Sequence, residues 1–180
     1  MDNGDASLCR FLEGEKDAFD RVLEIYFDNL TFFINRYVHD IGTAEDLAID
    51  TLLELIVHPK RFNFKVSLKT YLFTIGRNKA INYIRRRGRI AVTELTDNDV
   101  PSDYVSLEEE LIRDEERQRV SRAIDRLPDD MRAAVHLVYF EELTYAEAAK
   151  VMKKSPKQVD NLLYRAKKVI KDLIENGDKL

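Results

Sequence analysis

The sequence is poor in the residues on which disulfides, metal sites and nucleotide sites usually depend. It contains one cysteine, Cys9, which cannot form an internal disulfide or a thiolate zinc site alone. The three histidines, His39, His58 and His136, are dispersed without the spacing of metal ligands. Only six glycines occur, and they form no glycine-rich phosphate loop. We therefore expect no metal and no cofactor.

Long apolar runs are also missing. No run approaches the roughly 18 residues that a membrane span needs. Residues 1–7 have neither the basic flank nor the apolar core of a signal peptide. We therefore expect no membrane insertion and a cytoplasmic location.

One long segment lacks acidic residues, although the whole chain has 29 Lys and Arg against 33 Asp and Glu. Residues 55–93 carry 10 basic side chains and no acidic one, whereas residues 1–54 carry 4 basic and 13 acidic side chains. Residues 94–118 are acidic again, with 2 basic and 10 acidic side chains. Such blocks predict surfaces built for different partners, at least one of them polyanionic.

The periodicity predicts an all-α fold, because apolar residues recur at helical spacing and the alternation typical of strands is missing. An apolar stripe over residues 16–37 predicts a first long helix that ends near Gly42. A second helix is expected from Thr43 until Pro59 stops it. A third is expected from a Ser67 cap to the arginines at 85–87. The pattern breaks at Gly88. We expect two small helical domains, residues 1–90 and 107–180, joined by an acidic flexible linker over residues 91–106.

Two capping boxes predict a helix-turn-helix in the second domain. Thr144 and Glu147 stand at the spacing at which each side chain caps the other's backbone amide, and Ser155 and Gln158 repeat this pattern. Pro156 suits the first position of the second helix. The turn falls at Lys153 and Lys154, and the expected small-residue core comprises Ala146, Ala148 and Ala149.

The second helix of this motif has an outward face suited to DNA. Arg165 is able to read guanine, Asn161 adenine and Asp160 cytosine, while the cations hold phosphates. The alternative is a helical hairpin with a solvated basic face. The predicted duplex-binding residues are Lys157, Asp160, Asn161, Tyr164, Arg165 and Lys168.

The acid-free segment interleaves cations with aromatic residues, which suits single-stranded nucleic acid. Phe62-Asn63-Phe64-Lys65 is expected in a loop, where an extruded base stacks on a ring and bonds to Asn63. The alternative for Tyr71, Phe73 and Tyr83 is that they are core residues at helical spacing.

Over nearly its whole length, the chain resembles the extracytoplasmic-function (ECF) group of bacterial sigma factors. The motifs similar to the first conserved domain of that family are Ala44-Glu45-Asp46-Leu47 through Asp50 and Leu53, Phe62 to Ser67, Thr70-Tyr71-Leu72 and Ile75-Gly76-Arg77-Asn78. Those similar to its second domain are Asp125-Arg126-Leu127-Pro128, Leu143 to Ala149, and Val159 with Tyr164-Arg165-Ala166-Lys167.

The resemblance implies a promoter-specificity subunit that catalyses no reaction. It implies that core RNA polymerase, promoter DNA (duplex and melted) and an anti-sigma factor are partners. It also implies that the Asp160 to Lys168 face reads the minus-thirty-five element and that the acidic run from Glu94 to Asp103 occupies the polymerase channel that later holds RNA. The implied polymerase-docking residues are Asp46, Ile49, Asp50 and Leu53, and those for the melted minus-ten strand are Phe62, Asn63, Phe64, Lys65, Tyr71, Arg77 and Asn78.

Two positions depart from the family pattern. Tyr71 stands where the family usually has Trp, which implies a weaker melting contact. Lys153 stands in the turn where the family usually has Gly.

Other classes of function compete with this interpretation. A polymerase-independent helix-turn-helix regulator would use the first domain to dimerise or sense a ligand, and it would bind a palindromic duplex site. A helical adaptor would bind protein alone. A small helical enzyme lacks support, because the sequence offers no pair of nucleophile and base and no metal constellation.

Overall fold

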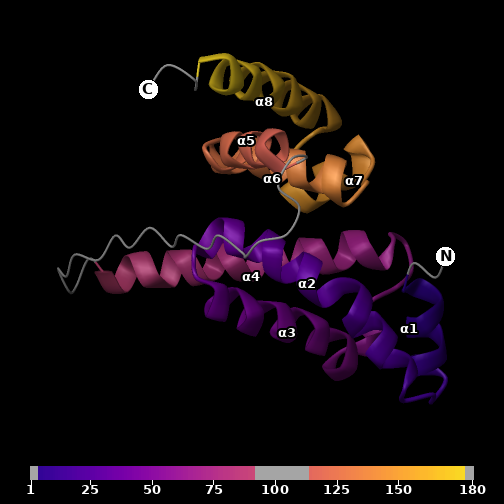
Figure 1. Ribbon diagram of the computed structural model, residues 1–180. Helices are drawn as coiled ribbons and strands as arrows, with labels where there is room; N and C mark the ends of the chain where they lie inside the picture. The colour runs from indigo at the N-terminus through magenta and orange to yellow at the C-terminus, as the bar shows by residue number, and fades with distance from the viewer. Residues whose placement is uncertain (1–3, 92–113, 177–180) are drawn as a thin grey trace. The chain divides into compact units, whose positions relative to one another are not determined.

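The computed structural model describes residues 4–91 and 114–176, and the regular elements of these ranges are helices (Figure 1). The chain divides into two compact units. The first contains α1 (Asp5–Leu12), α2 (Ala18–Val38), α3 (Ile41–Val57), the 3₁₀ turn η1 (Pro59–Arg61) and α4 (Leu68–Ala91). The second contains α5 (Asp114–Asp125), α6 (Asp129–Val135), the π-helical turn η2 (His136–Phe140), α7 (Tyr145–Met152) and α8 (Pro156–Asn176).

Helix α2 forms the centre of the first unit and packs on both α3 and α4 (Figure 1). Phe33 of α2 is fully buried and lies 5.1 Å, ring centre to ring centre, from Phe73 of α4. A Cβ atom at Gly76 would lie only 3.3 Å from Cδ1 of Ile34, so the Ile34 side chain would have to shift by a few tenths of an ångström to admit a larger residue. The absence of a side chain at Gly76 therefore lets α4 pack closely on α2 at this point.

The sequence patterns do not predict α1, and this helix caps α4. The Leu68 amide donates to Asp5 Oδ1 at 2.9 Å, and the Thr70 amide donates to Ser67 Oγ at 3.2 Å. Two of the amides at the start of α4 thus have side-chain acceptors, as the first turn of a helix requires. The predicted Ser67 cap is confirmed, and Asp5 supplies a second acceptor from a distant part of the chain.

The expected boundary between α2 and α3 is wrong by a few residues. α2 ends at Val38 rather than near Gly42, because His39 adopts a left-handed backbone with φ 54°. α3 begins at Ile41, before Thr43, because Asp40 has an extended backbone and its Oδ1 accepts from the Thr43 amide at 2.8 Å. The hydrogen bonds from Thr43 hold the pKa of Asp40 below its usual value, so this cap remains charged at neutral pH.

The expected break at Gly88 is also wrong, since α4 continues through it to Ala91. A glycine inside a helix costs about 1 kcal/mol relative to alanine, which weakens a helix without ending it. The predicted linker over residues 91–106 otherwise lies outside the described residues. No helix in the described ranges is long and apolar enough to cross a membrane.

In the second unit, α8 packs on α5 and α6, and both predicted capping boxes are confirmed. The Thr144 amide donates to Glu147 Oε2 at 3.0 Å, and the Glu147 amide donates to Thr144 Oγ1 at 3.3 Å. The Ser155 amide donates to Gln158 Oε1 at 2.7 Å, and the Gln158 amide donates to Ser155 Oγ at 3.2 Å. The helix-turn-helix is therefore fixed at the start of each of its helices.

One residue of the motif differs from expectation, and the turn lies where it was predicted. Ala148 and Ala149 are buried, but Ala146 is exposed and does not belong to the core. Lys153 occupies the turn with φ 55°, a left-handed conformation that glycine adopts more readily.

We predict that Asp5→Ala lowers the free energy of unfolding by about 1 to 2 kcal/mol, because the Leu68 amide loses its acceptor. Urea unfolding followed by circular dichroism measures the change. Asp28→Ala is the matched control, since Asp28 is an exposed acid on α2. Equal stability of the Asp5 and Asp28 variants would show that the cap contributes nothing.

Candidate nucleic-acid interface

The α3 residues predicted to dock on polymerase share one exposed face. Ile49 is 45% and Leu53 42% exposed, although both are large and apolar. Asp46 and Asp50 lie on the same face, because these positions are three or four residues apart along the helix, and both are exposed. An exposed apolar pair flanked by carboxylates is typical of a surface that binds a basic and apolar protein partner.

The loop between η1 and α4 divides its aromatic residues between core and surface. Phe62 is buried and packs against Phe64 and Tyr71, with ring centres 4.5 and 5.0 Å apart. Phe64 is 50% exposed, with a left-handed backbone at φ 57°. Asn63 and Lys65 are exposed, and Asn63 Oδ1 accepts from the Lys65 amide at 3.2 Å. The loop therefore exposes Phe64 and Asn63, whereas Phe62 is buried and packs against the Phe64 ring.

The other aromatic residues of the acid-free segment also differ in role. Phe73 is fully buried and is therefore a core residue, which confirms the alternative interpretation of this residue. Tyr83 is half-buried, and its hydroxyl lies 3.4 Å from Thr43 Oγ1. Tyr71 is half-buried at the edge of a groove, so part of its ring faces solvent.

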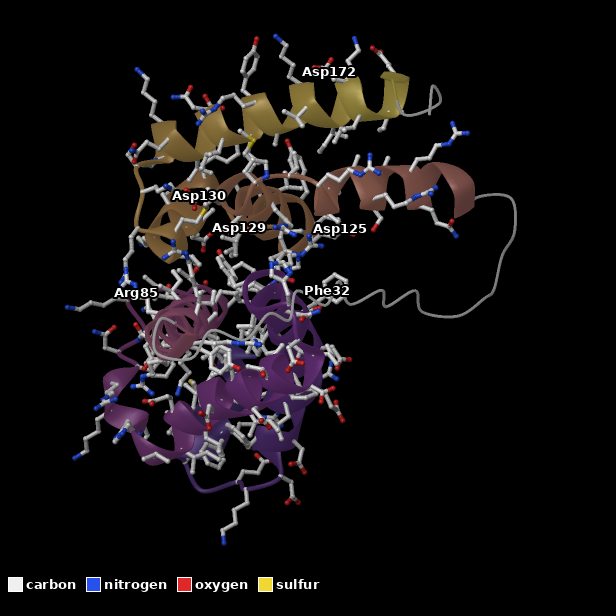
Figure 2. The ribbon with its side chains drawn as sticks, turned by 90° about the vertical axis from the view of Figure 1, so that its left-hand side faces the viewer. Phe32, Arg85, Asp125, Asp129, Asp130 and Asp172 are labelled. Atoms are coloured by element: carbon white, nitrogen blue, oxygen red, sulfur yellow. The ribbon has the colours of Figure 1, made fainter. Side chains whose placement is uncertain are left out.

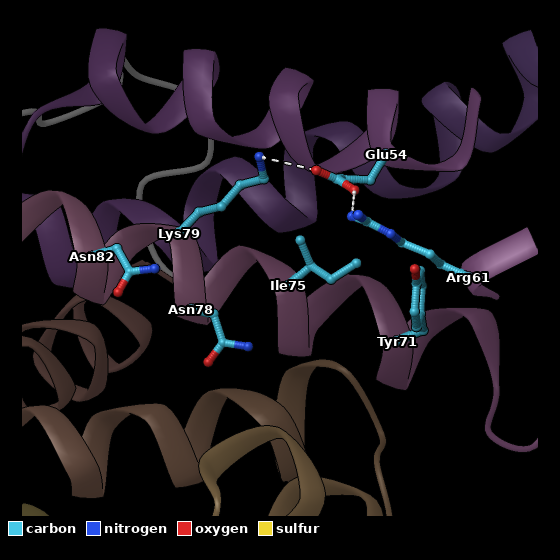
Figure 3. A pocket seen from close by; sticks show the side chains of 7 residues that line it. All are labelled: Glu54, Arg61, Tyr71, Ile75, Asn78, Lys79 and Asn82. Carbon is cyan, nitrogen blue, oxygen red and sulfur yellow. Dashed lines mark hydrogen bonds and ion pairs between the residues drawn. The ribbon is translucent and has the colours of Figure 1, made fainter. Parts of the chain in front are cut away.

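This groove lies between α3 and α4 and has a volume of about 440 Å³ (Figure 3). Glu54 stands inside it, with Oε2 at 3.1 Å from Arg61 and Oε1 at 3.8 Å from Nζ of Lys79. Burial raises the pKa of the Tyr71 hydroxyl, and the charge of Glu54 raises it further, while Arg61 lowers it. The hydroxyl therefore stays protonated at neutral pH. The groove is lined by Glu54, Arg61, Tyr71, Ile75, Asn78, Lys79 and Asn82.

The structure brings together only some of the residues predicted to bind a single strand. Asn78 lines the groove with Tyr71, whereas the Nε atom of the half-buried Arg77 is enclosed. Sequence reasoning missed Glu54 and Asn82 and gave no separate role to Arg61 and Lys79. The available signal was Glu54 itself, which lies one helical turn beyond Asp50 and immediately before the acid-free segment.

The outward face predicted for the recognition helix is confirmed on α8. Val159, Leu163 and Ala166 are buried beneath it. Charged side chains project from the side of α8 that faces away from α5 and α6, as seen near Asp172 in Figure 2. Arg165 is exposed, and its Nε donates weakly to the Asn161 carbonyl at 3.4 Å. The exposed residues are Lys157, Asp160, Asn161, Tyr164, Arg165 and Lys168, with Tyr164 74% exposed.

Lys167 adds to this surface, although the list of predicted duplex-binding residues does not contain it. Its Nζ lies 5.5 Å from the centre of the Tyr139 ring. A hydrogen bond to Tyr139 raises the pKa of Lys167, so its charge persists well above neutral pH. The contact with Tyr139 is contributed by η2, a segment that helical periodicity along α8 does not reveal.

Comparison with known proteins matches two family models to these two units. The model described as Sigma-70 region 2 matches residues 23–90, which include the α3 face, the loop and the groove. The model described as Sigma-70, region 4 matches residues 117–170, which include the helix-turn-helix.

Relatives are similar along nearly the whole chain. The RNA polymerase sigma-H factor of Pseudomonas aeruginosa is 31% identical over 170 residues, which cover 89% of this chain and 88% of that protein. The ECF RNA polymerase sigma factor SigM of Bacillus subtilis is 28% identical over 161 residues, which cover 89% of this chain and 97% of that protein.

A solved structure agrees with both comparisons. The sigma factor RpoE, in complex with the anti-sigma factor NepR from Bartonella quintana, has a TM-score of 0.68 and 26% identity to this chain. The match covers 87% of this chain and 96% of RpoE. Two sigma-70 regions in order, and a relative 31% identical along most of both chains, establish that this chain belongs to the ECF group of RNA polymerase sigma factors.

Proposed function

We propose that this chain, a promoter-recognising sigma factor, binds core RNA polymerase through the exposed face of α3 and directs initiation with two separate DNA-binding surfaces. The observation that carries this proposal is the pairing, within one unit, of the acidic and apolar face at Asp46, Ile49, Asp50 and Leu53 with the acid-free cationic surface of α4. A repressor that binds duplex DNA alone has no need of such a pair. The polymerase-independent regulator is therefore not favoured.

We assign residues 1–90 to docking and to the minus-ten element. Phe64 and Asn63 are accessible at the surface of the loop, and Tyr71 and Asn78 line the groove beside it. Lys65 is exposed and suited to a phosphate, Phe62 is buried and supports the loop, and Arg77 is half-buried with its Nε enclosed. Stacking on an exposed ring, with cations along the backbone, is how single strands are held without base pairing.

We assign residues 107–180 to the minus-thirty-five element. The two reciprocal capping boxes fix the starts of α7 and α8, and a helix-turn-helix of this kind supports the proposal that α8 enters the major groove. Arg165 and Asn161 are placed to read base edges, while Lys157 and Lys168 are placed to hold phosphates. The linker, residues 91–106, connects the two activities.

An anti-sigma factor is part of the proposal. RpoE, which this chain resembles, was solved in complex with one. A protein that covers the exposed α3 face or the α8 face would prevent promoter recognition. We propose that the chain works in the cytoplasm beside the polymerase and that it changes no covalent bond itself.

Asp50→Arg is expected to weaken binding to core polymerase by about tenfold or more, because it places a cation where a carboxylate is proposed to meet a basic partner. Pull-down of core polymerase at several sigma concentrations measures the loss. Asp28→Arg reverses the same charge on α2, outside the proposed face, and should bind normally. Unchanged holoenzyme assembly by the Asp50 variant would remove this face from the proposal.

Arg165→Ala should cost about 1 to 3 kcal/mol and relax discrimination at one base pair, since a bidentate contact to a base is lost. Lys168→Ala should weaken all sequences alike and reduce the salt slope by about one. Transcription with core polymerase on a randomised promoter library separates the two effects. An equal loss on every promoter for both variants would show that Arg165 reads no base.

Tyr71→Ala and Asn63→Ala should both initiate poorly on duplex promoters. On a template with a pre-melted minus-ten bubble, Tyr71→Ala should recover much of its activity, because the bubble already supplies the few kcal/mol that unstacking and unpairing require. Asn63→Ala should not recover in this way, since a base-reading contact is still missing. Permanganate footprinting of the bubble reports opening directly. Identical rescue of both variants would contradict this division between melting and reading.

A further inference from the structure

Glu54 lies in an unusual position for an acidic residue. It stands in a groove beside the acid-free segment, and its side chain is 25% exposed. One carboxylate oxygen faces Arg61 at 3.1 Å, and the other faces Lys79 at 3.8 Å. Figure 3 shows these two cations reaching Glu54 from opposite sides.

The groove also holds groups that suit one nucleotide. The Tyr71 ring stands beside Arg61, and the Asn78 and Asn82 amides lie farther along α4 (Figure 3). Arg61 is 62% exposed, so its guanidinium is accessible from solvent while it contacts Glu54. A volume of about 440 Å³ falls within the range of small-molecule sites.

The chemistry of the two cations identifies what would replace Glu54. Arginine and lysine bind carboxylates and phosphates through the same charge-assisted hydrogen bonds, and a phosphate offers more acceptor oxygens. Because residues 55–93 contain no Asp or Glu, the carboxylates that meet Arg61 and Lys79 come from α3. Lys79 also lies 3.9 Å from Oδ2 of Asp50.

We propose that the groove holds one nucleotide of the melted strand, and that Glu54 occupies the position of its phosphate in the free protein. This inference rests on the proposed function and adds a competitor to it. The incoming phosphate displaces Glu54 from Arg61 and Lys79, and the base lies against the exposed part of the Tyr71 ring. Glu54 thus lowers the affinity of the free sigma factor for single-stranded DNA by competing for the two cations.

The test measures binding of a fluorescein-labelled single-stranded DNA of mixed sequence, about 12 nucleotides long, to the full chain by anisotropy at several salt concentrations. Glu54→Gln keeps the shape of the side chain and removes its charge. We expect its Kd to be about three- to tenfold lower than that of the wild type, since two partly exposed ion pairs no longer compete. The salt slope should become steeper by about 0.7 to 1.4, as one or two more phosphate contacts form.

Glu24→Gln is the matched control, because Glu24 makes a comparable ion pair with Arg21 at 2.8 Å on the exposed surface of α2. This variant changes the net charge of the chain by the same amount without touching the groove. An equal gain in affinity for the Glu24 and Glu54 variants would overturn the proposal, because it would reflect net charge alone. Unchanged or weaker binding by a folded Glu54→Gln protein would overturn it as well.

A double-mutant cycle gives a second readout that does not depend on the Glu54 variant being more active. Lys79→Ala should cost less affinity in the wild type, where both Glu54 and Asp50 face Lys79, than in the Glu54→Gln background, where only Asp50 does. Equal costs in both backgrounds would overturn the proposal. If the wild-type chain and its holoenzyme bind no single-stranded DNA at all, the proposed function itself fails, and this inference fails with it.

Discussion

The close packing of α4 against α2 is the constraint on which the first unit depends. α4 belongs to a segment with ten cations and no acid. Repulsion among these charges disfavours the folded helix, so other contacts must hold it in place. Burial of Phe73 against Phe33, with Gly76 close to Ile34, supplies that hold through apolar contacts. The cations are thereby free to remain on the surface, where a polyanion reaches them.

The α3 helix connects the two proposed activities of this unit through its carboxylates. Asp50 lies on the face proposed for polymerase and also contacts Lys79, while Glu54, one turn later, contacts the same lysine and Arg61. Docking of a basic partner on Asp50 and entry of a phosphate beside Glu54 therefore act on one shared cation. Since both proposed sites involve Lys79, we expect occupation of one to alter the electrostatic environment of the other.

The extent to which the sequence predicted the structure depended on whether a contact was local. The reciprocal pairs Thr144 with Glu147 and Ser155 with Gln158 were predictable, because each spans three residues and follows a known capping pattern. The contacts of Glu54 were not, since they join α3 to residues on other elements through the tertiary fold. The left-handed backbone of exposed Lys153 was not predictable from the residue itself, since glycine adopts that conformation more readily; the turn there is closed by the Lys154 amide, which donates to the Ala149 carbonyl at 3.0 Å.

The hydrogen bond from Leu68 to Asp5 has a consequence for the order of events during synthesis. Its two partners are 63 residues apart, so α1 is synthesised well before the start of α4. At about 5 to 20 residues per second, several seconds separate the two. α1 and α2 must wait in that interval with part of their apolar surface uncovered, and the domain closes only when its last long helix emerges. The bond between Leu68 and Asp5 therefore becomes available only as the last long helix of the domain begins to emerge.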